Sequence, residues 1–303
     1  MLRRDFFKAL WAAGGTALIS GSKSSVRADQ SPASDDIPFD EDLIVLFSDT
    51  HVKKGFHTDG ALVSRLETLL GMNSRPRHLL IYGDFAYLWG KPEDYAYLRE
   101  LMRPVEEAGI RWDLAFGNHD RRKEFFEAFP ERVQSTPNVP GKYVSIVETP
   151  RADFILLDSL VEGEVQGKID EEQRAWLEAT LASYTKPVFV GAHHPIYQTH
   201  LEEILLAAPT VAGYINGHVH YWRHFVDNGL HQLMLPSTGY WGNIGFTTLR
   251  FVADEAIFKL HLYDCFRAEE GKDADPKVER KPEWLEEIRA KSDEAFIIPL
   301  TKR

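Results

Sequence analysis

The sequence predicts an α/β fold in which two packed sheets carry helices on their outer faces. The chain has 303 residues, of which 44% are hydrophobic and 27% charged, and this suits one large globular domain. Its first half alternates short apolar runs with segments of helical periodicity, whereas its second half is richer in adjacent strands. Because sheets and helices each bury an apolar face, this order favours two sheets packed together with helices outside.

The first half opens with a continuous apolar run at 43–47, which is typical of a strand buried on both faces. Residues 61–70 then place apolar side chains at helical spacing. The same two patterns predict four further elements, in chain order: strand 79–82, helix 95–102, strand 110–116 and helix 124–129.

The second half contains one clear amphipathic segment, a helix at 171–181. Apolar runs predict seven strands around it: 143–147, 154–157, 188–190, 211–215, 232–235, 247–252 and 257–263. Asp254 and Glu255 are expected to turn the last hairpin. Residues 267–280 are charged, and 283–291 have the pattern of a short surface helix.

The N-terminus has a different composition. Arg3-Arg4-Asp5-Phe6-Phe7-Lys8 precedes a mildly apolar stretch at 9–20, and Ala28 ends a compact site that suits a signal peptidase. This arrangement resembles a twin-arginine export signal, although an amphipathic helix or a membrane anchor stays open. We therefore expect a periplasmic or secreted protein that contacts the twin-arginine translocon transiently.

These patterns divide the chain into four expected parts. They are a signal peptide at 1–28, a linker at 29–41, a main domain at 42–265 and a charged C-terminal extension with a short helix at 266–303. The main domain has no long apolar run, so no stable membrane span is expected. Its only cysteine, Cys265, excludes an internal disulfide and is expected to be a small buried apolar residue.

The formal net charge of the chain is −11. Such an acidic surface repels nucleic-acid backbones and anionic membranes, so a nucleic-acid polymer is not an expected partner. An anionic small molecule would need a local positive centre, which bound metal ions can supply.

Side chains that bind metals follow five of the apolar runs. They occur in the segments Asp49-Thr50-His51, Gly83-Asp84, Gly117-Asn118-His119-Asp120, His193-His194-Pro195 and Gly217-His218-Val219-His220. Ligands of open α/β sheets bind beyond the carboxyl ends of strands, where all five segments are predicted to lie. Oxygen and imidazole ligands without thiols suit two ions such as Fe, Mn, Zn or Co, and paired ions promote in-line phosphoryl displacement.

The spacing within the segments suggests how the ligands converge. Asp49 and His51 are two residues apart, as are His218 and His220, and strand alternation would turn each pair toward one face. Asp84 follows a glycine, which lets the backbone approach closely. A carboxylate at that position can bridge two ions and hold them at a fixed separation.

The order of the five segments resembles that of the calcineurin-like metallophosphoesterases, over roughly 43–220. The resemblance implies a four-layer α/β/β/α sandwich with two mixed sheets and two divalent or trivalent ions (Fe, Mn or Zn). It also implies the ligands: Asp49, His51 and His220 for one ion, Asn118, His193 and His218 for the other, and Asp84 bridging both.

The same resemblance implies the catalytic roles. The nucleophile would be a metal-bridging hydroxide, and His119 would contact the phosphate and protonate the leaving oxygen. Asp120 would orient His119 through a hydrogen bond, and Asn118 would also contact substrate. The family ligand lies two residues before a proline, which favours His193 over His194.

The chain also offers clues to the type of ester. Gly83-Asp84-Phe85-Ala86-Tyr87 matches the Gly-Asp-x-x-Tyr of purple acid phosphatases, but His51 fills the position that the tyrosine occupies there, so Tyr87 is expected to pack. The segments around 117–129 and 157–177 resemble bacterial class III cyclic-nucleotide phosphodiesterases and related glycerophosphodiesterases, which favours a phosphodiester substrate. A phosphomonoesterase and a noncatalytic binding protein of the same fold remain alternatives.

Two residues outside the ligand set are expected to contact substrate. Arg122 is placed to touch the phosphate, with a helix-surface arginine as the alternative. Tyr240, which precedes Trp241, is placed to form an aromatic wall, with core packing as the alternative. Four other histidines are expected to be surface or hydrogen-bonded residues: His57, His200, His224 and His231.

Overall fold

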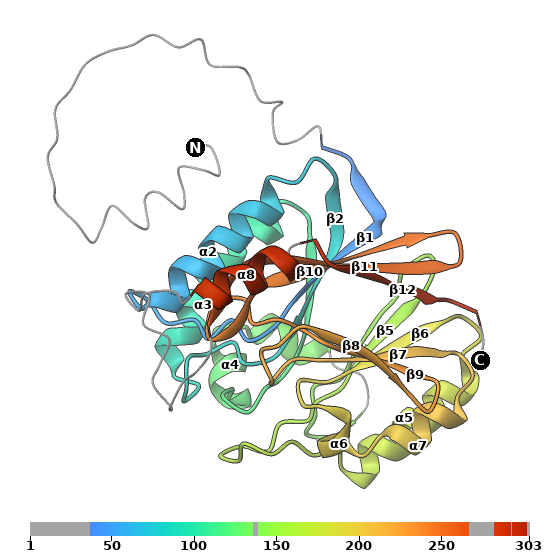
Figure 1. Ribbon diagram of the computed structural model, residues 1–303. Helices are drawn as coiled ribbons and strands as arrows, with labels where there is room; N and C mark the ends of the chain where they lie inside the picture. The colour runs from blue at the N-terminus through green and yellow to red at the C-terminus, as the bar shows by residue number, and fades with distance from the viewer. Residues whose placement is uncertain (1–36, 136–138, 267–281, 292, 302–303) are drawn as a thin grey trace, which may run out of the picture.

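The chain folds into two six-stranded sheets that lie face to face, with helices on both outer sides (Figure 1). This computed structural model describes residues 37–135, 139–266, 282–291 and 293–301. The first half contains β1 (Phe39–Phe47), α2 (His57–Leu70), β2 (Arg75–Tyr82), α3 (Pro92–Glu107), β3 (Arg111–Ala115), α4 (Arg122–Ala128), η1 (Pro130–Ser135), β4 (Ser145–Val147) and β5 (Asp153–Leu156). The second half contains α5 (Glu171–Ser183), β6 (Val188–Gly191), α6 (Ile196–Thr199), α7 (Glu202–Ala207), β7 (Val211–Asn216), β8 (Arg223–Asp227), β9 (Leu230–Met234), β10 (Gly242–Val252), β11 (Glu255–Phe266), α8 (Pro282–Lys291) and β12 (Ala295–Pro299).

Both sheets are mixed, as the sequence predicts. The first has the order β12-β11-β10-β1-β2-β3, in which β1, β2 and β3 are parallel and the other pairs antiparallel. The second has the order β4-β5-β6-β7-β9-β8, with four parallel strands in the middle and an antiparallel strand at each edge. Helical crossovers join the parallel strands β1 to β2 and β2 to β3.

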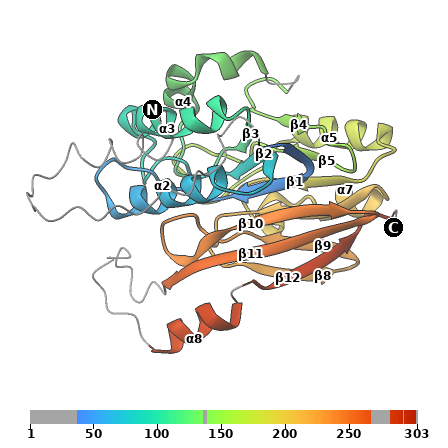
Figure 2. The same cartoon turned by 90° about the horizontal axis from the view of Figure 1, so that it is seen from above.

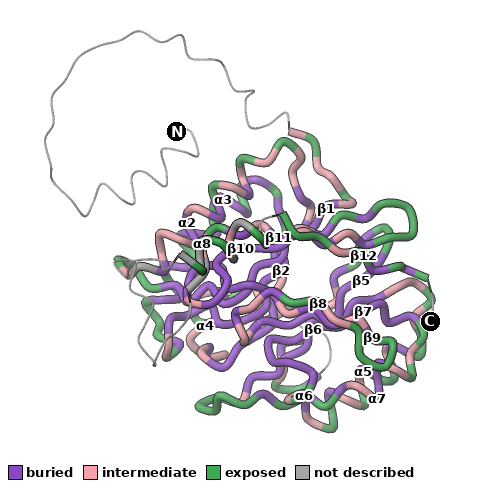
Figure 3. Tube along the Cα trace, viewed as in Figure 1, coloured by how far each residue is buried: buried purple, intermediate pink, exposed green. Residues whose placement is uncertain are grey.

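Alternating residues of β1 show how the layers form. Ile44 and Leu46 belong to the apolar cluster between the two sheets, whereas Val45 and Phe47 belong to the cluster beneath α2, α3 and α4. A third cluster joins the second sheet to α5, α6 and α7. Because successive strand residues point to opposite faces, a strand covered on both sides is apolar throughout. The three apolar clusters confirm the four-layer α/β/β/α sandwich, and Figure 3 shows buried residues along the strands of both sheets.

The C-terminal segment completes the first sheet. The sequence predicted its helix, observed as α8, but not β12, which pairs with β11 at the sheet edge (Figure 2). Residues 295–299 (Ala-Phe-Ile-Ile-Pro) are apolar, but this short run was not assigned to a strand; Ile297 is exposed and Ile298 buried. β8 was also missed, since only Phe225 and Val226 of its five residues are apolar. At the other end, β1 begins at Phe39, within the expected linker.

Several expectations fall on residues that the structure does not describe. These are the signal peptide at 1–28, the linker residues 29–36 and the charged segment at 267–280, together with the side chains of His57 and Cys265. Within the described segments, no helix has both the length and the apolarity needed to cross a bilayer.

Candidate metal centre

The seven predicted ligands gather where parallel strands end, as the sequence predicts. Side chains from the loops after β1, β2, β3, β6 and β7 meet there, although they come from both sheets. The side chains form two groups, and within each group the ligand atoms lie within 4.8 Å of one another. One group contains Asp49, His51, Asp84 and His220, and the other contains His193, His194 and His218.

A left-handed backbone turns five of these ligands toward the centre. All five have a positive φ: Asp49 (52°), His51 (42°), Asp84 (52°), His218 (70°) and His220 (58°). This conformation costs an ordinary residue about 1–2 kcal/mol, and such strain concentrates at functional sites. The expectation that strand alternation aligns these ligands was wrong, because β1 ends at Phe47 and β7 at Asn216.

Gly83 permits the close approach that the sequence suggested. Its φ is 82°, and a Cβ atom at this position would lie 2.5 Å from Nδ1 of His193 and 2.8 Å from the backbone nitrogen of Gly117. Any larger residue would therefore push apart two of the loops that carry ligands.

The first ligand group is arranged around one carboxylate oxygen. Asp49 Oδ1 lies 3.0 Å from Nε2 of His220 and 4.0 Å from Nε2 of His51. The other oxygen, Oδ2, accepts hydrogen bonds from the Ser48 hydroxyl and from the His218 backbone N–H, the latter at 3.1 Å. Two fixed donors therefore hold the carboxylate so that Oδ1 faces the imidazoles.

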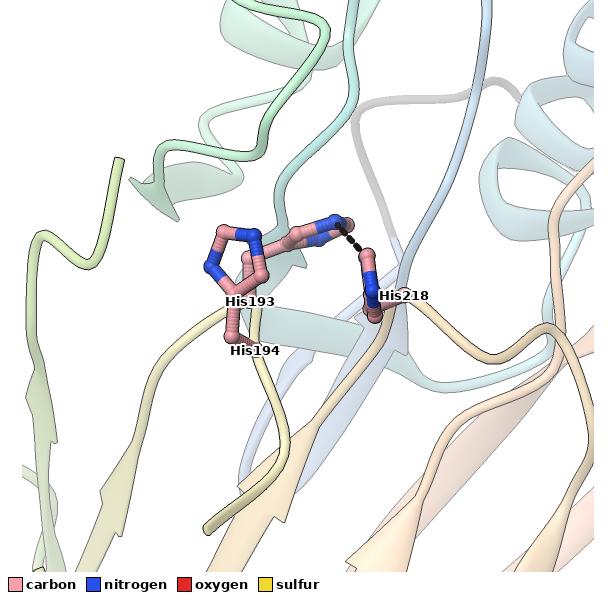
Figure 4. Close-up of side chains that lie close together, drawn as sticks. All are labelled: His193, His194 and His218. Carbon is pink, nitrogen blue, oxygen red and sulfur yellow. Dashed lines mark hydrogen bonds between the residues drawn. The ribbon is translucent and has the colours of Figure 1, made fainter. Parts of the chain in front are cut away.

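The second group is centred on an amide oxygen. Asn118 Oδ1 lies 2.9 Å from Nδ1 of His218 and 3.2 Å from Nε2 of His193. Those two imidazole nitrogens are 3.3 Å apart, and Figure 4 shows this contact with the ring of His194 beside it.

Asp84 lies between the two groups. Its Oδ2 is 3.2 Å from Nε2 of His193 in the second group and 3.7 Å from Nε2 of His51 in the first. Its Oδ1 accepts a hydrogen bond of 2.8 Å from the backbone N–H of His119. One carboxylate thus faces both groups, as a bridging ligand must.

Backbone carbonyls set the orientation of two imidazoles. Nδ1 of His193 lies 2.7 Å from the Tyr82 carbonyl oxygen, and Nδ1 of His220 lies 3.1 Å from that of Trp241. Since a carbonyl only accepts, each Nδ1 carries a proton, and each ring turns its Nε2 inward. The sequence could not show these partners, because a backbone carbonyl has no residue type that marks it.

The donor set fits metal ions. Nε2 of His51 and Nε2 of His220 are only 3.4 Å apart, and His193 and His218 present a second close nitrogen pair. Lone pairs at this distance repel unless a proton or a cation lies between them. Nitrogen and oxygen donors with two carboxylates satisfy the preferences of Zn, Mn or Fe.

Burial and mutual charge shift the pKa values of these groups. Burial alone would raise the pKa of Asp49, but His220 and His193 lower it to about 2. Burial lowers the pKa of His51 to about 3 and that of His218 to about 4. Burial would also lower the pKa of His193, but Asp84 and Asp49 raise it to about 9. Asp49 is therefore ionised and His51 and His218 are neutral, the forms that bind metal, whereas metal binding would displace a proton from His193.

His194 occupies a different environment from His193. Its Nδ1 lies 2.8 Å from the Ser159 hydroxyl, and its Nε2 is buried without a hydrogen-bond partner among the described residues. Burial lowers its pKa to about 2. His193 is the histidine that contacts both Asp84 and Asn118.

His119 stands at the edge of the centre but is not oriented as expected. Its Nδ1 lies 2.8 Å from the carbonyl oxygen of Leu88, and its ring centre is 5.2 Å from that of His51. The expectation that Asp120 orients it was wrong. Asp120 points into the core, where its Oδ1 accepts from two backbone N–H groups and Tyr95 and its Oδ2 accepts from Gly117 N–H.

Arg122 does not face the centre either, which corrects its expected substrate contact. Its Nε and Nη2 donate to the two oxygens of the buried Asp158, at 2.8 and 2.7 Å, and Nη2 also donates to the Leu160 carbonyl at 2.8 Å. The guanidinium is thus fully used in joining α4 to the loop after β5. In the sequence, this arginine differs in no visible way from one that binds phosphate.

Tyr240 lies against the metal ligands. Its ring centre is 4.4 Å from that of His51 and 5.8 Å from that of His220, and the residue is only 7% exposed. Tyr87 packs in turn against Tyr240 at 5.7 Å and against Phe56 at 4.5 Å. The expected packing role of Tyr87 therefore agrees with its contacts: Tyr240 packs on His51, and Tyr87 packs on Tyr240.

The fold and the centre together define a class: an α/β/β/α sandwich with Asp, Asn and His ligands at its strand ends. Residues 43–222 match the calcineurin-like phosphoesterases, and the chain belongs to this family.

The chain is similar to two curated phosphodiesterases. It is 27% identical over 190 residues to a probable cyclic nucleotide phosphodiesterase of Rhodopseudomonas palustris, covering 60% of this chain and 65% of that protein. It is 26% identical over 163 residues to the glycerophosphodiester phosphodiesterase GpdQ of Enterobacter lignolyticus, covering 50% and 56%. The chain thus spans less than two thirds of the length of either relative.

Among solved structures, the purple acid phosphatase PPD1 of yellow lupin has a similar fold. The TM-score is 0.56 at 13% sequence identity, and the match covers 85% of this chain and 53% of that one. At this identity the likeness concerns the fold alone.

Proposed function

We propose that the chain hydrolyses phosphodiesters at a centre of two metal ions. The observation that carries this proposal is the position of Asp84, whose Oδ2 faces His51 in one ligand group and His193 in the other. The two phosphodiesterase relatives support a diester rather than a monoester.

The residues divide the work. When bound, two ions supply an activated water and neutralise charge on the phosphoryl oxygens. Asp49, Asp84 and Asn118 would hold the two ions in a buried setting, where electrostatic interactions are stronger than in water. The Nδ1–H of His119 is committed to the Leu88 carbonyl, so its Nε2 is the atom that can carry a proton to the leaving oxygen.

Turnover of two chromogenic esters tests this proposal. The protein is loaded with Mn, Fe or Zn, its metal content is measured, and bis-p-nitrophenyl phosphate is compared with p-nitrophenyl phosphate. We expect two ions per chain and faster turnover of the diester. Faster turnover of the monoester would instead indicate a phosphomonoesterase. No turnover of either ester with two ions bound would indicate a noncatalytic binding protein.

We also propose that the protein is exported. The paired Arg3 and Arg4 followed by Phe6, Phe7 and Lys8 support this proposal. Fractionation of the native host should place the protein outside the cytoplasm, and the replacement of Arg3 and Arg4 by lysines should retain it inside. Export of that variant at the wild-type level would contradict a twin-arginine route.

A further inference from the structure

A hollow of about 320 Å³ opens beside the metal centre, between the loop after β1 and the loop that joins β2 to α3. The first loop contributes Lys53 and Lys54, and the second contributes Leu88, Trp89 and Lys91. This volume is within the range of sites that bind small organic molecules.

Two residues that line the hollow connect it to the metal centre. The Leu88 carbonyl that holds His119 belongs to a residue that lines the hollow. Tyr87 lines it as well, and its ring packs on Tyr240, which packs on His51. A substrate whose phosphate reaches the metal ligands therefore has the hollow as an adjoining place for its organic part.

The hollow is richer in positive charge than the chain as a whole, which is acidic. Lysines 53, 54 and 91 line it, together with the carboxylates of Glu93 and Asp94. Lys54 and Lys91 reach acidic partners only at 3.5 and 3.8 Å through exposed side chains. Such exposed pairs are weak and can exchange for a ligand anion.

Lys53 differs from the other two lysines because aromatic rings hold its ammonium group. Its Nζ lies 5.1 Å from the ring centre of Tyr87 and 5.2 Å from that of Phe56. The carboxylate of Asp94, which is only 3% exposed, is the acid near it, and a backbone hydrogen bond from Tyr87 engages that carboxylate. Lys53 is thus held beside Tyr87, the lining residue whose ring packs on Tyr240.

Trp89 supplies an apolar surface in the same hollow. The residue is 68% exposed, which is unusual for a side chain of this size. Gly90 follows it with φ 60°, and a Cβ there would lie 2.5 Å from the Arg121 side chain, so the turn that presents Trp89 has little room for change.

We propose that this hollow binds the organic part of the substrate and selects phosphodiesters that carry a flat ring and a second anionic group. The ring would stack on Trp89, and Lys53, Lys54 and Lys91 would receive the additional anion. This inference rests on the proposed phosphodiesterase function and specifies its substrate class.

A matched pair of substrates tests the selection. One is the p-nitrophenyl ester of thymidine monophosphate, and the other is the same ester with a second phosphate on the sugar. Ring, scissile bond and leaving group are identical, so the ratio of the two kcat/KM values isolates the added anion. For the wild-type, metal-loaded protein we expect a preference of about 10-fold or more for the bisphosphate, since each exposed ion pair contributes up to about 5-fold.

Substitution of the lysines then assigns the preference. In the triple variant Lys53→Gln, Lys54→Gln, Lys91→Gln the ratio should fall below about 2-fold. Lys259→Gln, a control at an exposed lysine of β11 that pairs with Asp293, should keep the wild-type ratio. A wild-type ratio near one, or an unchanged ratio in the triple variant, would overturn the inference and leave the proposed phosphodiesterase function intact.

A binding measurement separates this inference from the proposed function. If neither ester is hydrolysed, the phosphodiesterase proposal fails, and calorimetry with thymidine bisphosphate as the probe decides the hollow. A dissociation constant raised about 10-fold or more in the triple variant, but not in Lys259→Gln, supports the site. Equal affinity of wild type and triple variant rejects it.

Discussion

Replacing Arg122 by methionine should destabilise the protein without weakening substrate binding. The guanidinium donates two hydrogen bonds to Asp158, which is fully buried, and a third to the Leu160 carbonyl. Removal of one partner from a buried ion pair costs about 3–5 kcal/mol. Here the backbone N–H groups of Tyr143 and Leu160 still reach the carboxylate, and the Arg122 side chain is 20% exposed. We therefore expect the free energy of unfolding to fall by about 2–3 kcal/mol.

Urea unfolding with linear extrapolation measures this loss. Arg99→Met is the matched control, because Arg99 pairs with Glu131 at 2.8 Å while both side chains are about half exposed. That pair should contribute less than about 1 kcal/mol. Equal losses in the two variants would refute the structural role of Arg122. A raised KM for the diester with a small loss of stability would instead indicate that Arg122 contacts the substrate.

Three further predictions concern the centre itself. Asp84→Asn should reduce the bound metal from two ions toward one, measured by elemental analysis, because the amide keeps the shape but loses the charge between the two groups; two ions bound as tightly as in wild type would contradict the bridging role. His119→Ala, with metal content retained, should slow alkyl diesters by about 100- to 10,000-fold and p-nitrophenyl esters far less, because a good leaving group needs no proton; equal losses for both ester types would remove His119 as the acid. The metal-free protein should lose stability between pH 6.5 and 5, because burial lowers the pKa of His51 to about 3 and that of His194 to about 2. Below pH 6.5 the unfolded chain binds protons on these two histidines and the folded chain does not, which lowers the free energy of unfolding by about 2 kcal/mol per ring by pH 5. His193 partly offsets this loss, because its raised pKa of about 9 acts with the opposite sign. Urea titrations at the two pH values after chelation should show the lower free energy of unfolding at pH 5, and a higher one would contradict the prediction.

The convergence of the seven candidate ligands was predictable from sequence because each of the segments that carry them follows an apolar run. Parallel strands bring their carboxyl ends to one edge, so Asp49, Asp84 and His193 meet although they are far apart in the chain. The backbone conformation that turns the ligands toward one another was not predictable. A pattern of residue types does not show that Asp49 and His51 adopt a left-handed backbone, and strand alternation, which we expected instead, does not apply there.

Proximity in sequence also failed to predict which way a side chain points. Asp120 directly follows His119, yet the turn at that point sends its carboxylate inward to the Gly117 N–H while the ring of His119 bonds the Leu88 carbonyl. Arg122 likewise follows the ligand loop but begins α4, which turns it toward Asp158. Side-chain direction depends on the backbone conformation of each residue, which motif spacing does not contain.

Ser48 and backbone groups, which are not ligands, hold the ligand atoms in place. The Ser48 hydroxyl, whose single proton serves one acceptor at a time, lies against one oxygen of Asp49 and 2.9 Å from the Tyr82 carbonyl, and the backbone N–H of His218 donates to the same Asp49 oxygen. The Tyr82 carbonyl also lies 2.7 Å from Nδ1 of His193, so Ser48 and this carbonyl lie between a ligand of the first group and a ligand of the second. Because these contacts and the left-handed turns are properties of the fold, the ligand loops are held by hydrogen bonds and backbone conformation that leave the inward-facing ligand atoms uninvolved. Binding of a metal ion is therefore expected to need little rearrangement of the loops.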